Sequence, residues 1–173
     1  MTHSVLDHSD SARTIKLAER LAFSSNFQPI FDEGMTLVDE TAAYLDGDGR
    51  RDARTISRGA STLYAAESMR LTTRLMQVAS WLLLQRAANQ GDMSRAQVEA
   101  EKVKVRLDGI GGGADSPFYD ELPEAFRDLV KRAVMLERRV AILDREIYGE
   151  PRPEASGNPV GEQMHLLRTA FAV

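Results

Sequence analysis

The sequence predicts an all-α protein: an antiparallel three-helix bundle with shorter extra helices and a disordered C-terminal tail. Of the 173 residues, 43% are hydrophobic but only 6% are aromatic, so aliphatic side chains must fill the core, which suits packed helices. Apolar residues recur at three- and four-residue steps through three long stretches. Three of the six prolines fall in the last 25 residues, a composition typical of disorder.

These patterns divide the chain into three parts. We expect residues 1–14 to be a flexible N-terminus, residues 15–149 to form the helical bundle domain, and residues 150–173 to form a flexible tail with an apolar C-terminal segment.

The first long helix is expected to begin near Phe27, after a short amphipathic stretch that ends at Ser24-Ser25-Asn26. Pro29 would then lie in the first turn, where its missing N–H has no intrahelical partner to lose. Asp46-Gly47-Asp48-Gly49 should end this helix.

The second long helix is predicted from Arg50 to Asn89, with Gly91 ending it. One of its apolar faces carries Met69, Met76 and Leu83, and a second face is also apolar. Because most of the circumference is apolar, this helix is expected at the centre of the bundle.

The second half of the chain contains two further helices. Ser94 and Gln97 predict a capping box that opens a helix reaching about residue 107, although the alternation at 102–107 would also suit a strand. Glycines at 109 and 111–113 predict a flexible connector. The last helix should begin between Asp120 and Pro123, and its heptad spacing predicts coiled-coil-like packing of Phe126, Leu129, Ala133, Leu136, Val140, Leu143 and Ile147.

No catalytic site, cofactor or metal site is predicted. The chain has no cysteine, and its three histidines lie outside the predicted long helices. The Glu-x-x-His motif of carboxylate-bridged metal bundles is absent. The longest apolar run, Trp81–Leu84, is too short to span a membrane, and the start of the chain does not read as a signal peptide. We therefore expect a non-enzymatic, cytoplasmic protein.

Charge distribution provides the first candidate site. The net charge of −4 separates into +4 over residues 50–74 and −8 elsewhere. We predict a basic face that binds an acidic protein surface, because arginine favours bidentate contacts with carboxylates. Its residues are Arg50, Arg54, Arg58, Arg70 and Arg74. The alternative is a solvated face with intrahelical ion pairs, and nucleic acid is disfavoured because interleaved aromatic residues are absent.

Two apolar features complete the candidate partner-binding residues. The second helix has one polar stripe, formed by Glu67, Arg70, Arg74 and Gln77, and Trp81 and Leu84 continue it. The end of the helix that carries Trp81 and Leu84 therefore either contacts a partner or is buried within the fold. In the tail, Leu166, Leu167 and Phe171 follow a proline-rich spacer and have the form of a tethered recognition segment. The alternative is an unused, frayed tail.

One stretch also resembles a known family. Glu67-Ser68-Met69-Arg70-Leu71-Thr72-Thr73-Arg74-Leu75-Met76-Gln77, continuing through residues 79–87, is similar to the corresponding block of the RcdA family, the regulators of CtrA degradation in alphaproteobacteria. Weaker similarity extends over about residues 15–150.

The resemblance implies a non-catalytic adaptor, with no cofactor, in cell-cycle proteolysis by the ClpXP protease. It implies protein partners: the protease-priming response regulator CpdR, a second adaptor such as PopA, and cargo proteins. It also implies a homodimer, enrichment at the cell pole and a functional C-terminal tail. The alternatives left open are a small helical ligand-binding or enzymatic bundle, and a regulator associated with nucleic acid.

Overall fold

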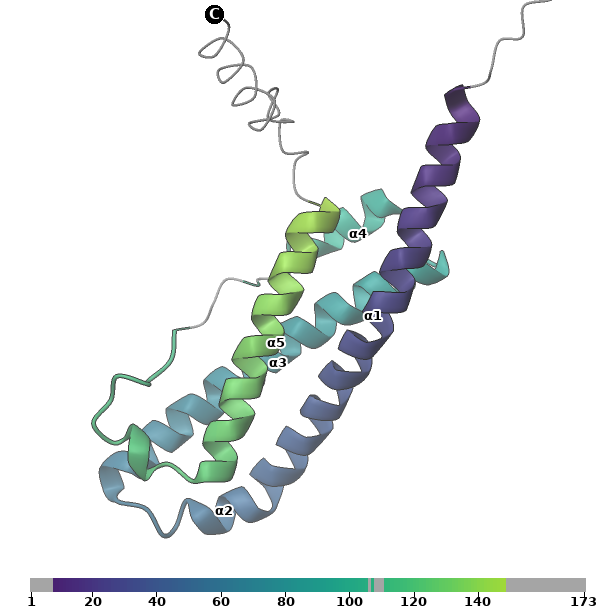
Figure 1. Cartoon of the computed structure of the whole chain (residues 1–173). Coiled ribbons are helices and arrows are strands. Elements are labelled where there is room, and N and C mark those ends of the chain that lie inside the picture. The colour runs from purple at the N-terminus through teal and green to yellow at the C-terminus, as the bar shows by residue number, and fades with distance from the viewer. Residues whose placement is uncertain (1–7, 106, 108–110, 149–173) are drawn as a thin grey trace, which may run out of the picture. The chain divides into compact units, whose positions relative to one another are not determined.

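The structure is a computed structural model that describes the backbone of residues 8–105, 107 and 111–148, and side chains from residue 25 onward. Its elements are α1 (His8–Asp46), α2 (Asp48–Asp52), α3 (Arg58–Gln90), α4 (Arg95–Lys102), the 3₁₀ turn η1 (Tyr119–Glu121) and α5 (Glu124–Tyr148) (Figure 1). The described residues contain no strand, so the all-α prediction is confirmed. The predicted tail, with Leu166, Leu167 and Phe171, lies outside the described residues.

Helix α1 is one continuous helix that begins at His8, so the predicted break at Ser24-Ser25-Asn26 is wrong. Ser25 and Asn26 are exposed, whereas Phe27, Ile30 and Phe31 are buried. Packing of these apolar residues on both sides of Pro29 outweighs the weak local preference of the polar residues for a turn, which explains why a proline inside the helix is tolerated.

The connection after α1 differs from the prediction in one respect. Helix α1 ends at Asp46, as predicted. Helix α3 begins at Arg58 instead of Arg50, because the Ser57 side chain caps its first turn. The Ser57 hydroxyl accepts a hydrogen bond from the Ala60 N–H at 3.2 Å. The short helix α2 fills the gap. Gly91 ends α3 with φ of 83°, a left-handed conformation that favours glycine.

The predicted capping box is present at the start of α4. The Gln97 N–H donates to the Ser94 hydroxyl, and the Ser94 N–H donates to the Gln97 side chain. The helix ends at Lys102, about one turn before the predicted end, and residues 103–105 are not in a strand.

The chain divides into two compact units after Ala141, and the three long helices contact one another within the first. Phe27 of α1 packs on Trp81 of α3. The ring centroid of Phe126 in α5 lies 4.5 Å from that of Tyr64 in α3 and 6.3 Å from that of Tyr44 in α1. The predicted heptad positions of α5 are buried through this unit: Phe126, Leu129, Ala133, Leu136 and Val140. The second unit contains the last described turns of α5, Ile142–Tyr148.

Gly34 lies at a close approach between α1 and α3. A Cβ at this position would collide with Leu82 Cδ1 of α3 and would lie 3.6 Å from Leu136 Cδ2 of α5. The absence of a side chain therefore lets α1 fit against both other long helices.

We expect Gly34→Ala to lower the free energy of unfolding by about 1–3 kcal/mol, because overpacking outweighs the gain in helix propensity. Urea unfolding followed by circular dichroism measures the change. Leu82→Val removes the colliding Cδ1, so the same alanine substitution should cost less in that background. An equal cost in both backgrounds would show that the close approach is not the cause.

Candidate functional site

The predicted basic face is divided by the structure. Arg50, Arg54 and Arg58 are exposed around α2 and the first turn of α3. Arg50 forms an ion pair with Asp46 at 2.6 Å, within the same corner of the chain. Across the described residues, no carboxylate lies within ion-pair distance of Arg54 or Arg58. These two guanidinium groups are therefore available to an acidic partner.

Arg70 and Arg74 do not extend this exposed face. Arg70 is half-buried and forms an ion pair with Glu67, whose side chain is 1% exposed. The Nε of Arg74 donates to Oε2 of Glu137 in α5 at 2.9 Å, and the two side chains are only 4% and 6% exposed. The predicted role of Arg74 in surface binding is wrong, because its charge is neutralised inside the fold by a residue 63 positions along the chain.

Trp81 is also part of the core. Its exposed fraction is 1%, and its ring centroid lies 6.5 Å from that of Phe27. Leu84, one turn later, is half-buried. Of the two interpretations offered by the sequence, burial within the fold is the one observed for Trp81, because α1 extends past this end of α3 and covers it.

Helix α3 also carries an exposed apolar surface that its sequence pattern did not predict. Met69, Met76 and Leu83 recur every seven residues and are 74%, 65% and 52% exposed, and we call them the methionine stripe. Although α3 was predicted at the centre of the bundle, this apolar face is not covered by the other described helices. A groove of about 180 Å³ between α1 and α3 adjoins the stripe, and it is lined by Val38, Thr41, Ala42, Leu45, Thr72, Leu75, Met76 and Ala79.

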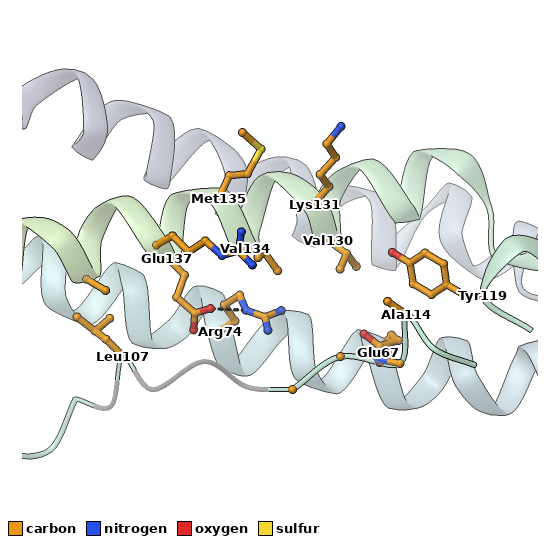
Figure 2. Close-up of a pocket in the computed structure, with 15 residues that line it drawn as sticks. Glu67, Arg74, Leu107, Ala114, Tyr119, Val130, Lys131, Val134, Met135 and Glu137 are labelled. Carbon is orange, nitrogen blue, oxygen red and sulfur yellow. Dashed lines mark hydrogen bonds and ion pairs between the residues drawn. The ribbon is translucent and has the colours of Figure 1, made fainter. Parts of the chain in front are cut away.

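A larger cavity, of about 800 Å³, lies between α3, α5 and the segment at 111–119 (Figure 2). The Gly113 N–H donates to Glu67 Oε1 at 2.7 Å, which attaches this segment to α3. A Cβ on Gly113 would lie 2.6 Å from Leu63 Cδ1 and 2.8 Å from Glu67 Oε1, so a larger residue here would displace these side chains. Gly113 is therefore a packing residue, which the prediction of a flexible connector did not anticipate.

The ionisable groups of the described residues were compared with known kinds of metal site. Nowhere in the described part of the chain do three His, Cys, Asp or Glu residues gather in a way that would hold a metal ion. Burial raises the pKa of the Tyr44 and Tyr64 phenols, so both phenols stay neutral near pH 7. Tyr44 donates to Asp52 at 2.9 Å. Among the described helices, none has the length and apolarity needed to cross a membrane.

Comparison with known proteins places the chain in a family of all-α proteins. Residues 18–171 match the family described as "Protein of unknown function (DUF1465)". Among solved structures, the chain is similar to RcdA from Caulobacter crescentus CB15, with 47% sequence identity, a TM-score of 0.58, and coverage of 72% of this chain and 92% of that one. Comparison with curated proteins finds no match. The chain belongs to the RcdA family, as the block at residues 67–87 predicted.

The buried ion pair of this site gives a direct test of its structural role. Removing one partner, as in Arg74→Met or Glu137→Leu, should cost about 3–5 kcal/mol in the free energy of unfolding, because an uncompensated charge stays buried. The double variant should recover most of that loss. Urea unfolding of the three variants measures the coupling, and additive losses would contradict a direct interaction between the two side chains.

Proposed function

We propose that this protein is a non-catalytic adaptor that helps deliver cell-cycle regulatory proteins to the ClpXP protease. The observation that carries the proposal is the 47% identity to RcdA over 92% of that chain, which is too extensive to reflect a shared fold alone. On this proposal the protein works in the cytoplasm, with enrichment at the cell pole. Its partners are the response regulator CpdR, a second adaptor such as PopA, and the cargo.

The proposed contact surface for these partners is the exposed part of the basic segment. Arg54 and Arg58 have no carboxylate partner among the described residues, and Arg50 is paired only with the exposed Asp46. Because such charges are not committed to the fold, an acidic partner gains their attraction without breaking a buried contact. The tail at residues 150–173, with Leu166, Leu167 and Phe171, is proposed as a second recognition segment.

Delivery is tested by reconstitution with purified ClpXP, CpdR and a fluorescent cargo protein. We expect Arg54→Glu combined with Arg58→Glu to reduce the cargo degradation rate about tenfold at low salt, since reversed charges slow association. Arg95→Glu combined with Lys104→Glu is the matched control, because it reverses two exposed cations of another segment. Equal degradation rates for both double variants would contradict the proposed role of Arg54 and Arg58 in partner binding. The proposed role of the tail is tested separately with a chain that ends at residue 149.

We further propose that the methionine stripe forms a homodimer with a second copy of the chain. Met69, Met76 and Leu83 have the seven-residue spacing of a helix that packs along another helix. The adjoining groove between α1 and α3 offers space for the partner's side chains, and large exposed apolar groups in such a row are unfavourable in water.

Met69→Glu combined with Met76→Glu should convert the dimer to a monomer, because two carboxylates on each copy would be buried in the interface. Light scattering after size-exclusion chromatography measures the mass, and circular dichroism checks the fold. Val103→Glu is the control, since Val103 is 82% exposed and lies outside the stripe. A dimer that persists in the methionine variant would place the interface elsewhere.

A further inference from the structure

The cavity between α3, α5 and residues 111–119 is lined by both apolar and charged residues (Figure 2). Its volume of about 800 Å³ falls within the range of sites that enclose small organic ligands. The apolar wall comes from Leu107, Val130, Val134 and Met135. A ligand of this site therefore needs an apolar body.

One of the residues that line the cavity, Glu137, has an acceptor without a donor. One carboxylate oxygen of Glu137, Oε2, accepts a hydrogen bond from Arg74 Nε. The other oxygen, Oε1, is buried and has no hydrogen-bond partner. A buried acceptor of this kind is unfavourable until a donor reaches it. Because Arg74 already neutralises the carboxylate, a neutral N–H or O–H donor suits this position better than a second cation.

The rim of the cavity carries two cations. Lys131 and Arg138 are exposed on α5 and line the opening, and neither has a carboxylate partner among the described residues. Two uncompensated positive charges beside an apolar wall favour a ligand whose outer end is negative.

We propose that this cavity binds an amphipathic organic anion: an apolar chain with a neutral hydrogen-bond donor that reaches Glu137 and an acidic group that pairs with Lys131 and Arg138. The site uses neither the methionine stripe nor Arg54 and Arg58, so it is separate from the surfaces proposed for protein partners. The Glu67–Gly113 contact holds the segment that closes one side of the cavity.

N-octanoylglycine has the required chemistry, with an alkyl chain, an amide N–H and a carboxylate. Binding is measured by titration into the ¹⁵N-labelled full-length chain, with amide shifts followed at residues 111–114 and 130–138. Two analogues separate the contributions. Octanoylglycinamide lacks the charge, and undecanoate keeps the charge and chain length but lacks the N–H.

We expect N-octanoylglycine to shift the cavity amides and both analogues to bind several-fold more weakly. Lys131→Gln combined with Arg138→Gln should weaken N-octanoylglycine about three- to tenfold and leave octanoylglycinamide unchanged. Arg51→Gln combined with Arg95→Gln removes two exposed cations that do not line the cavity, so it is the matched control and should have no effect. Val134→Trp, which places a bulky ring in the cavity wall, should weaken the shifts in a variant that circular dichroism shows to be folded.

Three results would overturn the proposal. The first is a set of shifts confined to the methionine stripe, which would indicate nonspecific apolar adsorption. The second is equal affinity for the three compounds, and the third is unchanged binding by the variant lacking both rim cations. Loss of delivery to ClpXP plays no part in these measurements, so failure of the adaptor proposal would not alter their outcome.

Discussion

The ion pair between Arg74 and Glu137 is the interaction on which the arrangement of α3 against α5 depends. Both side chains are almost fully buried, so each charge is tolerated only while the other is within hydrogen-bond distance. This requirement fixes one position of α3 against one position of α5. Arg74 and Glu137 also line the large cavity, so the same contact that joins the two helices contributes polar groups to the proposed ligand site.

Glu67 plays a related role two turns earlier on α3. Its buried carboxylate accepts from the Gly113 N–H and pairs with Arg70, so one side chain both anchors the connection before α5 and neutralises a neighbouring arginine. Two of the arginines that make residues 50–74 strongly basic are thus used within the fold. The charge left for partners is concentrated at Arg50, Arg54 and Arg58, close to the corner between α1 and α3.

Most elements of the fold follow from local patterns. The heptad of α5 from Phe126 to Val140 is buried as predicted, and the Ser94–Gln97 capping box and the Gly91 end of α3 depend on contacts within a few residues. The errors arise where long-range packing decides. The break before Phe27 is absent because Phe27 packs on Trp81 of α3 there. Arg74, in the polar stripe of α3, is buried because it forms an ion pair with Glu137 of α5.

The sequence by itself determined the all-α class, the ends of several helices, the family and the presence of a basic segment, because these depend on periodicity, capping and residue identity. Only the tertiary structure decided which charges and apolar groups reach the surface. Trp81 and Arg74 are buried, whereas Met69, Met76 and Leu83 are exposed, although both sets lie on one helix. The physical reason is that α3 is apolar around most of its circumference, so its own pattern does not specify which face α1 and α5 cover.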